Sequence, residues 1–236
     1  MLEIGLFFLG TPYGAGTLDT KRVEGLVINL KKLDCTTFVE DVVALAWVIA
    51  SRERTFETFR SLLRKIRYRQ GRLQGYCSRL HYFSDWIRDN QKKGIIRDVT
   101  EEIGGRPLRK AVNFMTTHPD LYPRLRNGAN LRRMKSVERR ISRRSLFVIS
   151  KKALRRLEDR LRSGDLIAIT TNTEGLDVSH VGLAVRVKGR VHLLHASSKE
   201  GKVVVSRNTL YRYLMQSRAR TGMMVARVCD RWTVQN

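Results

Sequence analysis

Residues 33–50 read LDCTTFVEDVVALAWVIA, a stretch that combines a helix-start signal with a long apolar stripe. Its apolar side chains recur at three- and four-residue spacing, which predicts a buried amphipathic helix over residues 36–50. They are Phe38, Val42, Leu45 and Ile49, with Val39, Val43 and Ala46 beside them. Asp34 is a typical N-cap residue, so Cys35 is expected in the first turn of this helix.

The expected position of Cys35 favours a reactive thiol. A thiol in a first helical turn faces unpaired backbone N–H groups and the positive end of the helix dipole, which lowers its pKa. The same amides could hold an oxyanion. The alternative is a small buried apolar residue, which is the ordinary role of cysteine and our interpretation of Cys77 and Cys229. Three scattered cysteines without a CxxC pair predict neither a disulfide framework nor a zinc ribbon.

Charge is the unusual feature of the composition. The 236 residues include 46 Lys and Arg but only 22 Asp and Glu, a formal net charge of +24. Such a charge attracts polyanions, whether nucleic acid, anionic lipid or acidic wall polymers. Residues 124–162, which we call the basic belt, contain 15 of the cations and three acidic residues. The hydrophobic content of 42% predicts a folded chain, and no apolar stretch approaches the roughly 20 residues of a membrane-spanning helix.

The order of the remaining elements predicts an α+β fold. Further helices are expected at 55–68, at 82–90, and within the basic belt at about 129–143 and 151–162. A strand is expected at 146–149, and residues 94–123 predict short strands and loops. The last third predicts a short helix near 207–216 and five strands, at 165–170, 178–187, 191–195, 203–206 and 222–228. We interpret residues 1–236 as one domain, with a helical half at about 1–162 and a sheet half at about 163–229.

Two of the five histidines are expected to meet on the sheet. Lys188-Gly189 suits a two-residue hairpin turn, and in that register His180 and His195 point to the same face as diagonal neighbours. Gly182 then leaves room beside His195, and His192 points to the other face. A one-residue bulge would reverse this assignment. The alternative for such a pair is plain cross-strand packing.

A thiol and two imidazoles together predict nucleophilic catalysis. In this interpretation Cys35 is the nucleophile, His180 is its base, and His195 orients His180 through the other ring nitrogen. The sequence contains no HExxH, GxSxG, Walker or GxGxxG motif. We therefore expect neither a metal nor a cofactor.

Several motifs in the same order resemble those of the NlpC/P60 superfamily of cell-wall cysteine peptidases and amidases. They are Gly10-Thr11-Pro12-Tyr13, Leu33-Asp34-Cys35-Thr36-Thr37-Phe38-Val39, Ser179-His180-Val181-Gly182 and His195-Ala196-Ser197-Ser198. More narrowly, the chain resembles the N-acetylmuramoyl-L-alanine amidase-like branch (DUF1460), whose pattern also covers residues 79–86 and 113–115. The resemblance extends from about Leu6 to Arg227.

The resemblance implies a papain-like fold, in which a helix that bears the cysteine packs on an antiparallel sheet that bears both histidines. It assigns the nucleophile to Cys35, the base to His180 and the third catalytic member to His195. Tyr13 matches the tyrosine that precedes the nucleophile in this family, where its hydroxyl would stabilise the oxyanion or orient substrate. The alternative for Tyr13 is an aromatic residue of a turn, packed on the helix.

A second group of residues is predicted to contact substrate. It consists of Asp34, Arg79, His81, Asp85 and Trp86. Arg79 suits bidentate recognition of a carboxylate, and the indole of Trp86 could stack on a sugar. The alternatives are a local salt bridge and helix cap for the polar residues, and a core position for Trp86.

The expected activity is hydrolysis of the N-acetylmuramoyl-L-alanine amide bond in peptidoglycan or muropeptides. One alternative is a γ-D-glutamyl-diamino-acid endopeptidase of the same superfamily, and another is a polyanion-binding or nucleic-acid-binding module. Through the basic belt we expect contact with an anionic wall or membrane surface rather than with a specific nucleic acid. The family implies a periplasmic or exported location, although no signal peptide is visible in the chain. The sequence does not define the oligomeric state.

Overall fold

The computed structural model describes residues 1–19 and 23–229. Its α-helices are α1 (Leu2–Phe7), α2 (Cys35–Ala50), α3 (Phe56–Arg67), α4 (Phe83–Lys92), α5 (Thr100–Ile103), α6 (Phe114–Thr117), α7 (Gly128–Ser142), α8 (Leu154–Leu157) and α9 (Leu210–Met215). Short 3-10 turns are η1 (Arg69–Gly71), η2 (Tyr76–Ser78), η3 (Pro119–Leu121), η4 (Pro123–Arg126) and η5 (Glu158–Arg160). The strands are β1 (Ile96–Asp98), β2 (Arg106–Arg109), β3 (Ser145–Ser150), β4 (Leu166–Thr171), β5 (Val178–Val187), β6 (Arg190–Ser197), β7 (Lys202–Thr209) and β8 (Arg220–Val228).

All strands of the described chain join one antiparallel sheet. Its order is β2-β3-β8-β4-β5-β6-β7, and β1 pairs with β8. The expectation of an α+β fold with a late antiparallel sheet is confirmed. The division into a helical and a sheet half needs one correction, because β1, β2 and β3 precede residue 163 and pair into the same sheet.

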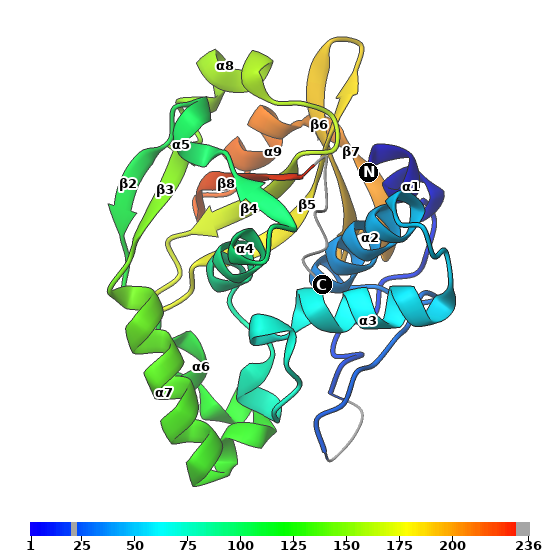
Figure 1. The fold of residues 1–236 in the computed structure, drawn as a ribbon. Helices are drawn as coiled ribbons and strands as arrows, with labels where there is room; N and C mark the ends of the chain where they lie inside the picture. Colours follow the sequence, from blue (N-terminus) through cyan, green and yellow to red (C-terminus); the bar gives the residue numbers. More distant parts are fainter. Residues whose placement is uncertain (20–22, 230–236) are drawn as a thin grey trace.

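Apolar side chains cover both faces of the sheet. Along β4, Leu166 and Ala168 belong to the core under α2, α3 and α4, whereas Ile167 and Ile169 belong to the core under α9. This alternation follows from the two-residue period of a strand. Figure 1 shows α2 running beside β5, β6 and β7, and α7 extending below the sheet with α6. A third apolar cluster packs α7 against residues of η2, α6 and η4.

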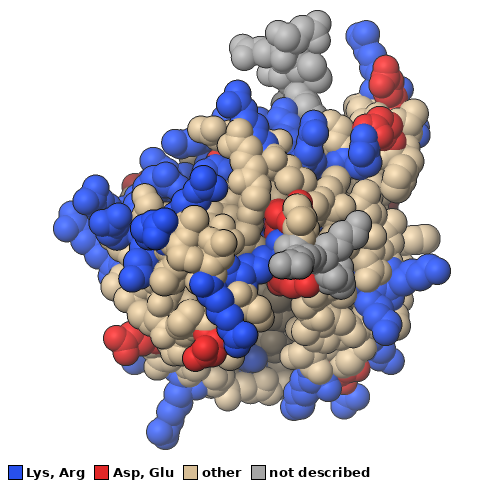
Figure 2. All heavy atoms as spheres, turned by 90° about the horizontal axis from the view of Figure 1, so that it is seen from below, with Lys and Arg blue, Asp and Glu red and all other residues tan. Residues whose placement is uncertain are grey.

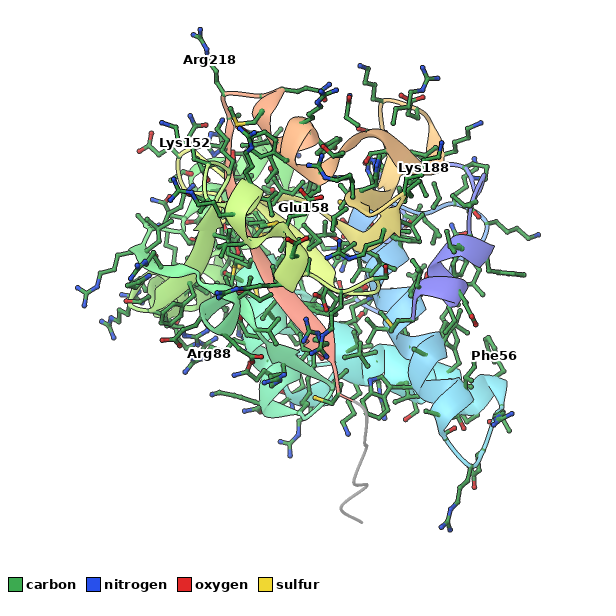
Figure 3. The ribbon with its side chains drawn as sticks, turned by 90° about the horizontal axis from the view of Figure 1, so that it is seen from above. Phe56, Arg88, Lys152, Glu158, Lys188 and Arg218 are labelled. Carbon is green, nitrogen blue, oxygen red and sulfur yellow. The ribbon has the colours of Figure 1, made fainter. Side chains whose placement is uncertain are left out.

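The predicted helices agree with the structure except in the basic belt. Helix α7 matches the expected helix at about 129–143, but the expected helix at 151–162 is reduced to α8 and η5. The reason is Glu158, a buried residue whose carboxylate accepts the Val191 N–H at 2.7 Å and two hydrogen bonds from Arg190, at 3.0 and 2.9 Å. These contacts to β6 fix the chain in a tight turn. Figure 3 shows Glu158 near the middle of the view from above, with Lys152, Lys188 and Arg218 around it.

In the part of the chain that the structure describes, no helix combines the length and apolarity that crossing a membrane requires.

Candidate active site

A capping box fixes the start of α2. The Asp34 carboxylate accepts the Thr37 N–H at 2.7 Å, and the Thr37 hydroxyl oxygen accepts the Asp34 N–H at 2.9 Å. Asp34 is therefore the N-cap, as predicted, and Cys35 is the first helical residue. Reciprocal bonds of this kind satisfy two of the amides that every helix start leaves unpaired.

The two histidines meet across the β5–β6 hairpin as the register predicts. Val187 pairs with Arg190 and Leu183 with Leu194, so no bulge interrupts the pairing between the hairpin turn and residue 183. The Nε2 atom of His180 lies 2.6 Å from Nδ1 of His195. Their ring centroids are 4.7 Å apart, with the rings at 88°. His192 instead bonds the Ser206 carbonyl through Nδ1 at 2.8 Å, away from this pair.

Two glycine positions allow this hairpin geometry. Lys188 and Gly189 both have positive φ angles, 48° and 79°, as a two-residue primed turn requires. A Cβ atom on Gly182 would lie 2.6 Å from the Leu194 carbonyl oxygen and 2.9 Å from Cβ of His195. A larger residue there would push His195 away, so the prediction that Gly182 makes room for His195 is confirmed.

The thiol of Cys35 lies beside the strand that carries His180. The Val181 backbone and the Thr36 hydroxyl both act to lower the pKa of this thiol. Burial raises the pKa of Tyr213 on α9, and the Cys35 thiolate would add to this effect. Tyr213 in turn contacts both imidazoles, at 5.5 Å from the His195 ring and 6.4 Å from the His180 ring. Tyr213 therefore lies against the imidazole pair, and Cys35 lies at the start of α2, the helix that packs on the strand of His180.

The electrostatics of the site differ from the expectation for a helix-start thiol. Burial, with a further contribution from the Asp34 carboxylate, raises the pKa of Cys35 to about 11. The prediction of a lowered thiol pKa is therefore wrong, because desolvation and a neighbouring anion outweigh the helix dipole and the hydrogen bonds. Burial, together with the neighbouring His195 and Arg220 charges, lowers the pKa of His180 to about 3. Burial and the Arg220 cation lower the pKa of His195 to about 4. The resting site at neutral pH is a neutral thiol beside two neutral imidazoles.

Alkylation of Cys35 should report this resting state directly. Because the thiolate is the nucleophile and its pKa is raised to about 11, the rate of reaction with iodoacetamide should rise about tenfold per pH unit from pH 7 to pH 10. The rate is measured by mass spectrometry on the peptide that contains Cys35, which separates it from Cys77 and Cys229. A rate independent of pH between 6 and 9 would show an ionised thiol and contradict this assignment.

Tyr13 lies in the same region. Its backbone N–H donates to the Gly201 carbonyl at 2.8 Å, and it forms a parallel bridge with Leu33, two residues before Cys35. Burial raises the pKa of the Tyr13 phenol, and the Cys35 and Asp34 charges raise it further. The bridge to Leu33 holds the Tyr13 backbone near the start of α2.

Tyr213 and Arg220 are members of the site that the sequence did not indicate. The Arg220 guanidinium stacks 3.9 Å from the centre of the Tyr213 ring and donates to the Tyr213 carbonyl. This cation–π contact holds Tyr213 against His195. Neither residue stands in a motif, and only the fold brings α9 and β8 to the histidines.

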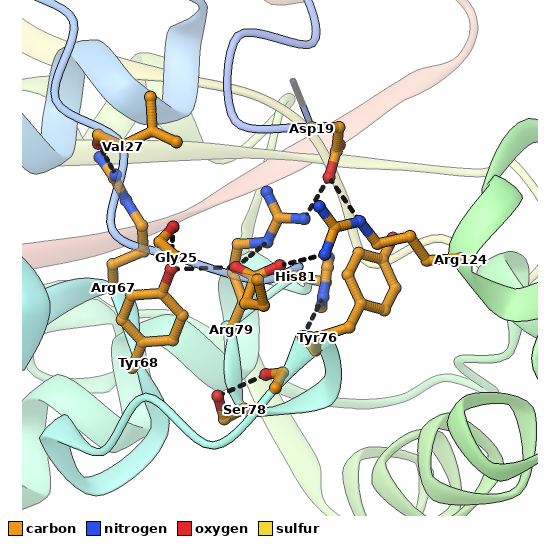
Figure 4. Close-up of polar contacts among 12 residues, drawn as sticks. Asp19, Gly25, Val27, Arg67, Tyr68, Tyr76, Ser78, Arg79, His81 and Arg124 are labelled. Carbon is orange, nitrogen blue, oxygen red and sulfur yellow. Dashed lines mark hydrogen bonds and ion pairs between the residues drawn. The ribbon is translucent and has the colours of Figure 1, made fainter. Parts of the chain in front are cut away.

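Three of the five predicted substrate contacts gather beside Cys35. A cavity of about 210 Å³ is lined by Asp34, Thr36, Arg79 and His81, together with Gly16, Leu18, Asp19, Glu40 and Leu80. The side chain of His81 bonds the Tyr76 carbonyl through Nε2 at 2.9 Å, and burial lowers its pKa to about 3. The Arg79 guanidinium is buried and pairs with Asp19 and, at 3.4 Å, with Glu24, as Figure 4 shows. The guanidinium forms part of the cavity wall and is not free to bind a substrate carboxylate.

The other two predicted contacts, Asp85 and Trp86, lie in the interior. Asp85 pairs with Arg69 at 2.6 Å and with Arg144 at 2.8 Å, so both carboxylate oxygens are engaged. Trp86 has no exposed surface and donates its indole N–H to Glu40 at 3.2 Å. A substrate cannot stack on an indole that has no exposed surface, so Trp86 is a core residue. Asp85 forms salt bridges and does not face a substrate. Trp86 belongs to the apolar face of α4, which packs in the core, whereas Asp85 is held by its two arginine partners.

Fold and site together define an α+β protein with a cysteine at a helix start beside a hydrogen-bonded histidine pair. The chain belongs to the N-acetylmuramoyl-L-alanine amidase-like (AmiA-like) family, whose model matches residues 3–223. Among curated proteins the comparison found no match.

Solved structures of similar chains support the family assignment. An N-acetylmuramoyl-L-alanine amidase from Bacteroides uniformis is 39% identical, with a TM-score of 0.92, and the match covers 97% of each chain. A Bacteroides fragilis protein described as a xylanase candidate is 44% identical, with a TM-score of 0.91, covering 96% of this chain and 100% of that one. A Legionella pneumophila protein assigned to DUF1460 is 24% identical with a TM-score of 0.69, covering 96% and 87%, and shows the shared fold.

Proposed function

We propose that this protein is a cysteine amidase that hydrolyses the bond between the lactyl group of N-acetylmuramic acid and L-alanine, in peptidoglycan or muropeptides. The observation that carries the proposal is the 2.6 Å contact between His180 Nε2 and His195 Nδ1 next to a helix-start cysteine. Family membership supports the substrate class. The arrangement supports assignment to the papain-like NlpC/P60 group, with a Cys–His–His triad.

The proton positions follow from the roles of the two imidazoles. Two neutral rings in contact share one proton, and if His180 Nε2–H donates to His195 Nδ1, then Nδ1 of His180 is free to accept a proton. Because its pKa is lowered to about 3, His180 is unprotonated at neutral pH. It takes the Cys35 proton as the sulfur attacks the lactyl carbonyl carbon, so that the thiol ionises during the attack rather than before it.

The remaining steps complete one hydrolysis. The carbonyl oxygen becomes an oxyanion, held by the Cys35 backbone N–H at the helix start and by the Tyr13 hydroxyl. His180 gives its proton to the departing nitrogen of L-alanine, which leaves a thioester between Cys35 and the muramoyl group. Water, activated by His180, then attacks the thioester and releases the muramic acid carboxylate and the thiol. His195 keeps the His180 ring in position throughout.

The cavity beside Cys35 suits an uncharged, hydroxyl-bearing group. With its Nε2–H donated to the Tyr76 carbonyl, the neutral His81 ring leaves Nδ1 as an acceptor. Asp34 and Thr36 also line this cavity, and the Thr36 hydroxyl adds an oxygen acceptor. We assign this cavity to the sugar side of the scissile bond, with Arg79 as a positioning residue that holds Asp19 in the wall.

Two other activities are distinguishable from this one. A γ-D-glutamyl-diamino-acid endopeptidase would use the same triad on a bond farther along the stem peptide. A xylanase, as one similar chain is described, would use two carboxylates that flank a glycosidic bond. At this site Asp34 is committed to capping α2 and Glu40 pairs with Arg67, so the residues present favour thiol chemistry. The proposed substrate also implies a periplasmic or exported location.

The test compares two substrates that differ only in the sugar. We expect the protein to cleave a disaccharide tetrapeptide between muramic acid and L-alanine and to leave the free tetrapeptide intact. Product masses identify the bond that is cut. Cleavage of the free tetrapeptide would instead indicate the endopeptidase, and salt-sensitive binding of duplex DNA without cleavage of either substrate would indicate the binding module.

A further inference from the structure

A second groove lies on α7, away from the cavity that Asp34, Thr36 and Arg79 line. It has a volume of about 820 Å³ and runs between α7 and residues 111–117. Its α7 wall carries four cations spaced along one helix face, Arg132, Lys135, Arg139 and Arg143. The opposite wall carries three uncharged polar side chains, Asn113, Thr116 and Thr117. Figure 2 shows Lys and Arg crowding the side of the molecule on which Figure 1 places α7.

The four groove cations are exposed and carry uncompensated charge. Within residues 1–19 and 23–229, no ion pair includes any of them. Other cations of the basic belt are compensated, since Arg144 pairs with Asp85 and Arg124 with Glu24. The row from Arg132 to Arg143 extends over about 16 Å of helix. The groove therefore presents a line of positive charge to an external anion.

Glu138, the carboxylate among the lining residues of the groove, forms no ion pair with these four cations in the described part of the chain. Glu138 is buried, and it accepts the Tyr82 hydroxyl at 2.7 Å, the Thr116 N–H at 3.0 Å and the Thr116 hydroxyl. On the next turn the Ser142 hydroxyl oxygen accepts the Val112 N–H at 2.9 Å. These contacts tie α7 to residues 111–117, so the two walls of the groove are held at a fixed separation.

The polar wall is also tied to the chain that leads to His180. The N–H groups of Asn113 and Phe114 both donate to the Gly175 carbonyl, each at 3.0 Å. His180 follows Gly175 by five residues, which span at most about 18 Å of extended chain. The polar wall of the groove is therefore anchored within this chain length of His180.

We infer that this groove binds the carboxylates of neighbouring stem peptides on polymeric peptidoglycan, an inference that rests on the proposed function. Stem peptides carry several carboxylates on a flexible chain, and arginine binds carboxylates through a two-pronged hydrogen bond. The polar wall of Asn113, Thr116 and Thr117 adds hydrogen-bonding groups for the backbone of a peptide beside the row of cations. The lining residues include no aromatic side chain on which nucleic-acid bases could stack.

The test neutralises the groove and an equal number of cations elsewhere. The groove variant is R132Q/K135Q/R139Q/R143Q, and its matched control is R52Q/R54Q/K152Q/R218Q, which changes four exposed cations outside the ion pairs. At low salt, kcat and KM are measured on soluble glycan chains that carry many stem peptides and on a single disaccharide tetrapeptide. We expect the groove variant to lose about tenfold or more in kcat/KM on the polymer, through KM, and less than about twofold on the single unit. The control should change less than about twofold on both.

Chemical amidation of the stem carboxylates tests the ligand class. Wild-type turnover of the amidated polymer should fall to that of the groove variant, and the groove variant should lose nothing further. Unchanged polymer turnover in the groove variant would overturn the inference, and so would equal losses of kcat/KM on the polymer and on the single unit. A variant that loses binding to duplex DNA or to phosphatidylglycerol vesicles, but keeps polymer turnover, would also overturn it. If wild type cleaves neither substrate, the proposed function fails, and sedimentation of the variants with polymer still tests the groove.

Discussion

Replacement of Cys35 with alanine should lower kcat/KM for a disaccharide tetrapeptide by at least about 10⁴-fold. The proposed mechanism forms a covalent bond to the Cys35 sulfur, and no other group in the site can replace a nucleophile of that kind. The change removes one sulfur atom from a capped helix start, so the capping box of Asp34 and Thr37 should persist. Turnover is measured by chromatography of the released peptide.

The matched control for this variant is Cys77→Ala. Cys77 is also partly buried, but its thiol donates to the Asn130 carbonyl at 3.3 Å, in the region of η2 and α7. We expect its kcat/KM to stay within about twofold of wild type. Circular dichroism confirms that both variants are folded. Retention of a tenth or more of the activity by Cys35→Ala would exclude the thiol mechanism.

Loss of the buried Glu40 carboxylate should produce the largest change in stability. Glu40 on α2 pairs with Arg67 on α3 at 2.6 Å, and each side chain is 2% exposed. Replacement of Glu40 with alanine leaves the guanidinium buried without its main partner and removes the acceptor of the Trp86 indole N–H. We expect the free energy of unfolding in urea to fall by about 3–5 kcal/mol.

Two further variants separate the missing charge from the missing volume. The double variant Glu40→Gln with Arg67→Met removes both charges and keeps an acceptor for Trp86, so it should recover most of the lost stability. Glu57→Ala breaks the exposed pair with Arg60 and should leave the unfolding midpoint unchanged within error. If the double variant is less stable than Glu40→Ala, the ion pair is not the cause of the loss.

Local sequence patterns predicted the parts of the site that local interactions determine. The Asp34 cap, the helix that starts at Cys35 and the hairpin register depend on residues a few positions apart. A two-residue turn fixes which residues of a hairpin face each other. The contact between His180 and His195 therefore followed from Lys188-Gly189 alone.

Features that depend on distant elements could not be predicted. The raised pKa of Cys35 reflects burial by the assembled fold, whereas the sequence showed only the helix dipole. The motif that contains Arg79 and Asp85 fits a substrate site as well as it fits structural salt bridges. Their ion-pair partners, Glu24 and Arg144, lie 55 and 59 residues away in the chain. Tyr213 reaches His195 only because α9 packs on the sheet.

The fold shows where the excess positive charge lies on the molecule. Within the basic belt, ion pairs such as that between Arg144 and Asp85 compensate part of the positive charge. The rest includes the four cations of the α7 groove. The net charge of +24 is thus consistent with an enzyme that works on an acidic polymer.

In the proposed mechanism Cys35 carries the muramoyl group during the reaction. The direct measurement is mass spectrometry of the protein quenched in acid within milliseconds of mixing with a disaccharide tetrapeptide. We predict an adduct on the peptide that contains Cys35, with the mass of the disaccharide acyl group and no amino acid. An adduct that also contains L-alanine, or rapid turnover with no adduct on Cys35 under any quench condition, would contradict the account.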